Sequence, residues 1–217
     1  MRIAVLGTGV VGTTLGTAFV RSGHEVRLGS RTADNATAAA WARDLGAPAG
    51  HGTFHDVAAW GEVVVNATAG LVTLDVLRSA GADALEGKAV LDVSNPLDFS
   101  GGFPPAVLQP EGRSVGEHVQ EAFPGARVVK TLNTMTAAVM VDPRSLPAAH
   151  TVFVAGDDAE AKTLVGGLLA DLGWAPDEVV DVGGIVAARG LELYLPLWLS
   201  LMSSFGTPAF NIRVVRG

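Results

Sequence analysis

Residues 2–12 read RIAVLGTGVVG, and this stretch decides the fold. Arg2–Leu6 is a short apolar run, typical of a strand that is buried on both faces. The pattern G-x-G-x-x-G follows it and opens a helical pattern over Val10–Arg21; its residues are Gly7, Thr8, Gly9, Val10, Val11 and Gly12. Between a strand and a helix this pattern predicts a dinucleotide site, in which the helix N-terminus faces the pyrophosphate.

Strand and helix patterns alternate along the rest of the chain. Strands are expected at residues 25–28, 62–66, 88–93, 127–132, 151–155, 178–182 and 210–215. Helices are expected at 34–45 with Asp34 as N-cap, at 73–85, after the capping box of Ser114 and Glu117, at 158–172, and at 184–204 with an interruption near Pro196. The alternation predicts an α/β protein with a Rossmann-type, doubly wound parallel sheet and a small C-terminal α/β extension.

The composition argues against several classes of protein. The chain has 217 residues, and its 15 Lys and Arg against 22 Asp and Glu give a net charge of −7, so we expect no nucleic-acid partner. Cysteine is absent, and His51 and His55 have no third ligand near them in sequence, so we expect no metal site. The most apolar window, Gly190–Phe205, carries Glu192 and is interpreted as a buried helix rather than a membrane span. Without a signal-peptide pattern, the expected location is the cytoplasm.

The residues after the second strand select the cofactor. Residues 29–32 read GSRT, with no carboxylate to bind the ribose 2′-hydroxyl of NAD. Ser30 and Thr32 offer hydroxyl groups, and the planar guanidinium of Arg31 suits a phosphate. We therefore predict NADP(H) as the cofactor. The alternative is that Arg31 is a solvated surface charge and that the site accepts either nucleotide.

Small and polar residues follow three later strands. Because the carboxyl ends of parallel strands line one crevice, we expect the following residues to border the cofactor: Ala67, Thr68, Asn95, Asn133 and Met135. Turn formation with Pro96 is an alternative role for Asn95. Asn133 follows an extended run with no turn residue after it, so it is our candidate for positioning the substrate. The sequence offers no acid–base dyad.

Three other features have two interpretations each. The loop Phe99–Gly112 is either a lid or a surface excursion. Arg189 either pairs with Glu192 three residues on, or meets an anionic part of a second substrate. An apolar stripe on the last helix, which includes Trp198, is interpreted as core or as a dimer face rather than as part of a cofactor site.

The chain resembles the coenzyme F420-dependent NADP oxidoreductase family over nearly its whole length. The shared stretches are MRIAVLGTGVVG (1–12), LGSR (28–31), LDVSNPLDF (91–99), ARVVKTLNTM (126–135), VFVAGDD (152–158), DLGW (171–174) and DVGGIVAARGLE (181–192). Several of them also resemble the nucleotide domain of membrane ferric reductases. The resemblance implies that Thr8, Ser30 and Arg31 hold the NADP phosphates. It also implies that a deazaflavin lies against the nicotinamide near Asn133, Met135 and the start of the last long helix.

Two positions depart from the family pattern. Archaeal members have a histidine where this chain has Asn133, and a basic residue that helps to hold the 2′-phosphate is replaced by Asn35. These departures bear on recognition of F420 and on the preference for NADP over NAD, respectively.

The leading functional hypothesis is an NADP(H)-dependent oxidoreductase that exchanges a hydride with coenzyme F420. Its organisation would be an NADP-binding Rossmann domain over residues 1–155 and a smaller C-terminal domain over 156–217, which contributes to the second-substrate pocket and to a dimer face. The alternatives are an NADPH-dependent reductase of another acceptor, such as a flavin, a quinone or an imine, and a non-catalytic NADP(H)-binding redox sensor. The expected partners are a small redox substrate and a second copy of the chain.

Overall fold

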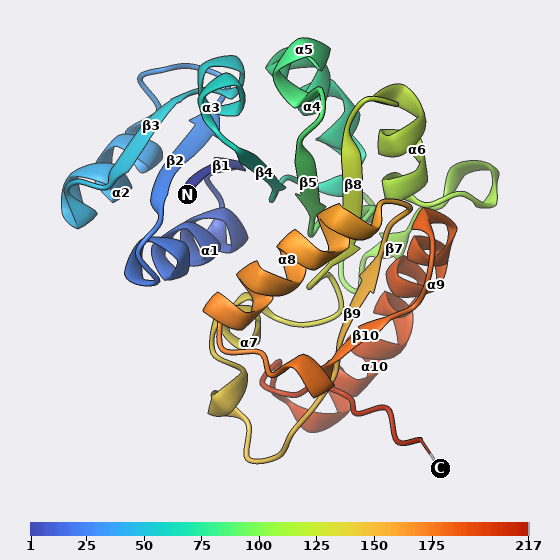
Figure 1. The fold of residues 1–217 in the computed structure, drawn as a ribbon. Helices are drawn as coiled ribbons and strands as arrows, with labels where there is room; N and C mark the ends of the chain where they lie inside the picture. Colours follow the sequence, from blue (N-terminus) through green and yellow to red (C-terminus); the bar gives the residue numbers. More distant parts are fainter. Residues whose placement is uncertain (217) are drawn as a thin grey trace.

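An eight-stranded sheet forms the centre of the computed structural model, which describes residues 1–216 (Figure 1). The strands are β1 (Arg2–Leu6), β2 (Glu25–Ser30), β3 (Ala49–Thr53), β4 (Val63–Asn66), β5 (Ala89–Asp92), β8 (Arg127–Thr131), β9 (Val152–Ala155) and β10 (Val179–Asp181). Their order is β10-β9-β8-β5-β4-β1-β2-β3. The chain therefore runs outward from β1 in one direction and then from β4 in the other, which creates a crevice at the carboxyl ends of these two neighbours.

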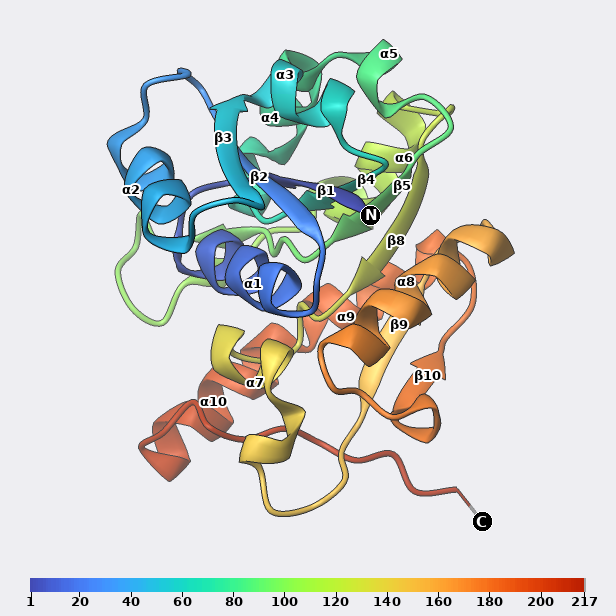
Figure 2. The ribbon, with the colours of Figure 1, turned by 60° about the vertical axis from the view of Figure 1, so that its left-hand side comes forward.

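Helices cover both faces of the sheet (Figures 1 and 2). The α-helices are α1 (Val10–Arg21), α2 (Ala36–Leu45), α3 (Phe54–Trp60), α4 (Thr73–Ala80), α5 (Ala82–Leu85), α6 (Val115–Ala122), α7 (Ala137–Val141), α8 (Ala159–Asp171), α9 (Ala188–Leu193) and α10 (Leu195–Phe205). One apolar core joins the sheet to α1, α7 and α8, and a second core joins it to α3, α4 and α6. The predicted doubly wound α/β fold is confirmed.

The apolar runs of the sequence form the centre of this sheet. Residues 3–6 of β1 and 63–66 of β4 are all buried, because helices cover them on both sides. Val5 pairs with Leu28 of β2 on one side and with Val65 of β4 on the other, and both pairings are parallel. The sheet reverses at β9, which pairs antiparallel with β8, and β10 then pairs parallel with β9. The last two strands thus extend the same sheet, and the predicted domain boundary at residue 155 stays a prediction.

The structure corrects several predicted elements. Asn35, not Asp34, caps α2, since its Oδ1 accepts from the backbone N–H of Ala38 at 3.0 Å. The predicted helix at 73–85 is broken at Gly81, whose φ of +95° lies outside the helical range. The segment Ala49–Thr53 is a strand that the sequence pattern did not indicate, because it carries two glycines and a histidine. The expected strand at 210–215 is not formed; hydrogen bonds join Ile212 and Val214 of this segment to Thr151.

The long C-terminal helical segment is interrupted where the sequence predicts, with Pro196 in the first turn of α10. The helical segment Ile185–Phe205 spans 21 residues and contains an 18-residue window with a mean hydropathy of 1.3, so its length and composition alone would allow it to cross a membrane. The expected buried helix is buried on one side only. Leu193, Leu197 and Phe205 are more than half exposed on one side, whereas Leu195 and Leu199 are buried on the other.

Candidate functional site

The glycine loop between β1 and α1 has the geometry of a phosphate cradle. Gly7 has a φ of +121°, and a side chain there would lie 2.6 Å from the carbonyl oxygen of Ala67. A Cβ on Gly12 would lie 2.2 Å from the carbonyl oxygen of Gly7, so these two glycines are needed for packing. A Cβ on Gly9 would meet nothing within 4 Å. Gly9 is also the N-cap of α1 and makes no side-chain cap bond, so no side chain caps the first N–H groups of this 12-residue helix.

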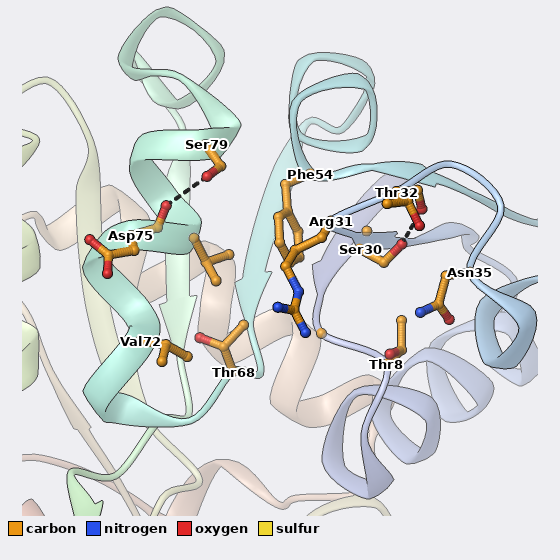
Figure 3. A pocket seen from close by; sticks show the side chains of 13 residues that line it. Thr8, Ser30, Arg31, Thr32, Asn35, Phe54, Thr68, Val72, Asp75 and Ser79 are labelled. Atoms are coloured by element: carbon orange, nitrogen blue, oxygen red, sulfur yellow. Dashed lines mark hydrogen bonds between the residues drawn. The ribbon is translucent and has the colours of Figure 1, made fainter.

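A cavity of about 780 Å³ lies on one side of this loop (Figure 3). One wall is formed by Gly7 and Thr8 from the loop, Ser30 at the end of β2, Arg31 and Thr32 directly after it, and Asn35, the N-cap of α2. The opposite wall comes from Thr68 and α4. Arg31 extends into the space between these walls, beside Phe54 (Figure 3). It is the one Lys or Arg among the described residues that line this cavity.

The turn after β2 is ordered by its own side chains. The Ser30 hydroxyl donates to the carbonyl oxygen of Thr32 at 2.5 Å, which fixes the backbone on both sides of Arg31. The Asn35 Oδ1 atom is engaged as the N-cap acceptor of α2. Its Nδ2 is therefore directed away from the helix, toward Thr8 and Ser30 (Figure 3). This wall of the cavity thus presents a guanidinium and a neutral amide donor to a bound group, while the opposite wall carries one carboxylate, Asp75, which pairs with Arg78.

A second cavity of about 470 Å³ lies on the other side of the glycine loop. It is lined by Gly9, Val10, Val11, Ala67, Thr68, Asn95, Asn133 and Met135 from the predicted set, and also by Ser94, Leu97, Phe99, Leu195 and Trp198. Thr68 borders both cavities, so the two are adjacent. Among the described residues that line the second cavity, none is Asp, Glu, His, Lys, Arg or Tyr.

Asn95 and Asn133 form a reciprocal pair in this second cavity. Asn133 Nδ2 donates to Asn95 Oδ1 at 2.9 Å and to the carbonyl oxygen of Leu191 at 3.1 Å. Asn95 Nδ2 donates to the carbonyl oxygen of Asn133 at 2.7 Å. Both hydrogens of the Asn133 amide are therefore used, and its Oδ1 is the atom left to accept a hydrogen bond from a ligand.

Three charged side chains are buried together behind the second cavity. Lys130 Nζ donates to Asp92 Oδ2 at 2.9 Å, to Glu192 Oε1 at 2.8 Å and to the carbonyl oxygen of Ser94 at 2.5 Å. All three side chains are fully buried. Burial lowers the pKa of Lys130, but the two carboxylates more than offset this effect, and its pKa lies above the ordinary value. The lysine is thus an ammonium ion.

The same cluster extends to neighbouring elements. Asn66, at the end of β4, donates to Asp92 Oδ1 at 2.7 Å and accepts from the Thr68 hydroxyl at 2.7 Å. Glu192 accepts from the backbone N–H groups of Val115 and Gly116 at the start of α6, at 3.0 and 3.3 Å. A continuous set of hydrogen bonds therefore joins three strand ends to α6 and α9.

Arg189 does not pair with Glu192, contrary to the first sequence interpretation. Its guanidinium forms a bidentate pair with Glu117 of α6, with Nε at 2.8 Å and Nη2 at 2.6 Å from the two carboxylate oxygens. The hydrogen bonds from Arg189, acting against burial and aided by those from Ser114, lower the pKa of Glu117 to about 2. The predicted capping box of Ser114 and Glu117 is present as well. Arg189 therefore joins α9 to α6 and does not line either cavity.

The residues predicted to bind the cofactor lie around the two cavities. All predicted cofactor-site residues line one of the two cavities except Gly12, which packs beneath Gly7. Their roles as ligands stay predictions. Among the described residues, no three His, Asp or Glu side chains gather as a metal site would require. His51 lies in β3 and His55 in α3, and each bonds a backbone oxygen.

The sequence patterns did not identify several residues that line or adjoin the second cavity. Leu195 and Trp198 line the second cavity although their stripe was interpreted as core or dimer face. Phe99, at the start of the long loop, lines it too, so this loop borders the site. The buried cluster of Asp92, Lys130 and Glu192 was also missed. A lysine inside an otherwise apolar strand, in the stretch RVVKTL, was the available signal.

The geometry defines a Rossmann-type site for a dinucleotide, and comparison with known proteins agrees. The family model for "NADP oxidoreductase coenzyme F420-dependent" matches residues 2–96. The F420-dependent NADP reductase of Methanothermobacter thermautotrophicus is 31% identical over 216 residues, covering 93% of this chain and 89% of that protein. A crystal structure of a candidate F420-dependent NADP-reductase from Arthrobacter sp. FB24 superposes with a TM-score of 0.94 at 45% identity, over 100% of both chains.

A rat protein, metalloreductase STEAP3, is 30% identical over 202 residues, which are 91% of this chain. This chain spans 38% of the length of that relative. The protein is thus of the NAD(P)-dependent oxidoreductase class. More specifically, the chain belongs to the coenzyme F420-dependent NADP oxidoreductase family, whose members bind NADP(H).

Proposed function

We propose that this protein transfers a hydride between NADP(H) and the deazaflavin coenzyme F420. The observation that carries the proposal is the pair of adjacent cavities on either side of one glycine loop: the first has the guanidinium of Arg31 on the wall beside that loop, and the second is uncharged and mostly apolar. A dinucleotide laid across the loop would place its adenosine half in the first cavity and its nicotinamide in the second.

The first cavity would hold the adenosine 2′-phosphate. Arg31 would supply a charge-assisted, planar contact, and the Nδ2 group of Asn35 would add a neutral donor. The free N–H groups at the start of α1 would face the pyrophosphate. NAD(H) lacks the 2′-phosphate, so it would leave Arg31 without its ligand.

The second cavity suits a reaction in which the protein supplies position rather than protons. Its described lining has no ionisable side chain, so no general acid is available to protonate a carbonyl or imine. A deazaflavin, when bound, supplies the hydride-accepting ring system itself. Asn133 Oδ1 would then orient the nicotinamide amide or the acceptor ring, while Leu195 and Trp198 would pack against the faces of the rings. The relatives named as F420-dependent NADP reductases support this acceptor.

The direct test is a spectrophotometric assay of the purified protein with NADPH and oxidised F420. We expect F420 reduction with NADPH and at least tenfold slower reduction with NADH. The Arg31→Ala variant should lose about 10- to 100-fold in affinity for NADPH and change little toward NADH. Equal losses for both nucleotides would overturn the assignment of the 2′-phosphate site.

The same assay separates the competing functions. Turnover with a flavin or a quinone but not with F420 would identify another acceptor. Tight NADPH binding with no oxidation by any of these acceptors would favour a redox sensor.

We also propose that the protein is a cytoplasmic homodimer. The exposed Leu193, Leu197 and Phe205 on α9 and α10 offer an apolar surface for a second copy. Insertion of this segment into a bilayer would break the bonds of Arg189 to Glu117 and of Glu192 to Lys130, so we favour a protein contact over a membrane. Light scattering behind size-exclusion chromatography tests the dimer, and flotation with liposomes tests the alternative.

A further inference from the structure

A net negative charge is buried directly behind the second cavity. Lys130 Nζ lies 2.5 Å from the carbonyl oxygen of Ser94, which is itself part of the cavity wall. Leu195, less than one helical turn after Glu192, is also part of that wall. The charged cluster of Asp92, Lys130 and Glu192 is therefore separated from the cavity by single residues.

The hydrogen bonds show the charge state of this cluster. Asp92 accepts from Asn66, Lys130 and the backbone N–H of Ser94. Glu192 accepts from Lys130 and from two backbone N–H groups of α6. Because every partner of these carboxyl oxygens is a donor, both groups are carboxylates. Two carboxylates and one ammonium leave a net charge of −1, which the N-terminal dipole of α6 offsets in part on the Glu192 side. The neighbouring pair of Glu117 and Arg189 is neutral overall.

We propose that this buried charge favours NADP⁺ over NADPH in the second cavity, so that Asp92 and Glu192 set the direction in which the bound cofactor tends to react. The inference rests on the proposed function, because it requires the nicotinamide to occupy this cavity. In the reaction, the C4–H bond of the dihydronicotinamide breaks and its electron pair moves with the hydrogen to C5 of the deazaflavin, which takes a proton from water at N1. The nicotinamide ring thereby changes from neutral to positively charged, and a nearby negative charge stabilises the charged form.

The size of the effect follows from the Coulomb energy. At about 10 Å and an effective dielectric constant of about 20, a unit charge changes the ratio of the two affinities by roughly tenfold. The helix dipole reduces this value, so we expect about three- to tenfold. Salt should alter the effect little, because the cluster is fully buried.

The experiment measures the dissociation constants of NADP⁺ and NADPH separately by isothermal titration calorimetry. The Glu192→Gln variant removes one negative charge and keeps the side-chain volume, and Asp92→Asn removes one from the other end of the cluster. In both variants the ratio of the NADP⁺ constant to the NADPH constant should rise about three- to tenfold. Glu121→Gln is the matched control: it removes a carboxylate from α6 that is 63% exposed and paired with Arg113, and should leave the ratio unchanged.

If Asp92 and Glu192 had a merely structural role, the variants would bind both nucleotides more weakly and the ratio of the two dissociation constants would stay the same. That result would overturn the inference. Circular dichroism melting curves identify a variant that does not fold. Wild-type protein provides a measurement that needs no variant: NADP⁺ binding ten or more times weaker than NADPH binding would also overturn the inference. If the wild type bound neither nucleotide, the proposed function would fail together with this inference, whereas two normal affinities with an unmoved ratio would overturn the inference alone.

Discussion

Asn133 and Asn95, which follow β8 and β5, form two hydrogen bonds with each other. Asn133 Nδ2 lies 2.9 Å from Asn95 Oδ1, and Asn95 Nδ2 lies 2.7 Å from the carbonyl oxygen of Asn133. The third contact, from Asn133 to the carbonyl oxygen of Leu191, extends this pairing to α9. Asn133 thus has one defined orientation, in which Oδ1 is available to a ligand. Asn95 is the residue that fixes this orientation from the end of β5.

Replacing Asn95 with Ala should therefore slow hydride transfer more than it weakens NADPH binding. The Asn133 side chain would keep a single partner, and a small misalignment of the reacting rings costs about 10- to 100-fold in rate. Single-turnover stopped-flow measurements with NADPH and F420 give the rate, and a fluorescence titration gives the affinity. Asn95→Asp retains the acceptor oxygen and should fall between Ala and wild type. A normal rate with weakened NADPH binding would instead make Asn95 a simple cofactor ligand.

Asn35→Asp separates helix capping from phosphate recognition. Asp and Asn cap helices about equally well, so the bond to the Ala38 N–H and the stability of α2 should be kept. The new carboxylate would replace the Nδ2 donor and repel the 2′-phosphate. The affinity for NADPH should therefore fall about tenfold or more, while the affinity for NADH should not change. Calorimetry with both nucleotides checks this outcome, and a melting curve checks the cap. A parallel loss for both nucleotides would place Asn35 outside the phosphate site.

The sequence predicted the glycine loop and the strand ends because these features are local. A strand, a G-x-G-x-x-G turn and a helix follow one another within 20 residues, and parallel strands must end at a common edge. That rule was enough to group Thr68, Asn95 and Asn133 at one edge of the sheet. The same locality explains why the capping box of Ser114 and Glu117 was found.

The partners of distant charges could not be predicted in this way. Arg189 and Glu192 have the spacing of a helical pair, yet each is bonded to a residue 62 or more positions earlier, Glu117 for one and Lys130 for the other. In a short helix the packing of α9 against α6 and β8 decides these pairs, and that packing is a property of the whole fold. The strand Ala49–Thr53 was missed for a similar reason, since an edge strand with glycines is stabilised by its neighbour β2 rather than by its own side chains.

The bond between Glu117 and Arg189 should make the protein sensitive to acid. The pKa of Glu117 is lowered from 4.5 to about 2 in the folded protein, so its contribution to stability is complete above about pH 4.5 and is lost as the pH falls through about 2. Urea unfolding between pH 2 and 6 measures this contribution. The difference in unfolding free energy between wild type and Glu117→Gln should be constant above about pH 5 and shrink below it. A difference that stays constant down to pH 2 would show that the folded and unfolded pKa values are equal.

Replacing Gly9 with Ala is expected to weaken NADPH binding without loss of stability, whereas replacing Gly12 with Ala is expected to destabilise the fold. Gly9 has φ −77° and ψ −175°, which any residue can adopt, and no atom lies within 4 Å of the new Cβ. Gly9→Ala should therefore fold and melt like wild type but bind NADPH at least tenfold more weakly, because the Cβ fills the space for the pyrophosphate. In Gly12→Ala the Cβ would meet the backbone oxygen of Gly7 at 2.2 Å, which cannot move aside as a flexible side chain could. This variant should lose about 1–3 kcal/mol or more of stability. Thermal melts and NADPH titrations of both variants test the pair: Gly9→Ala with normal affinity would remove the glycine loop from the nucleotide site, even if Gly12→Ala behaved as expected.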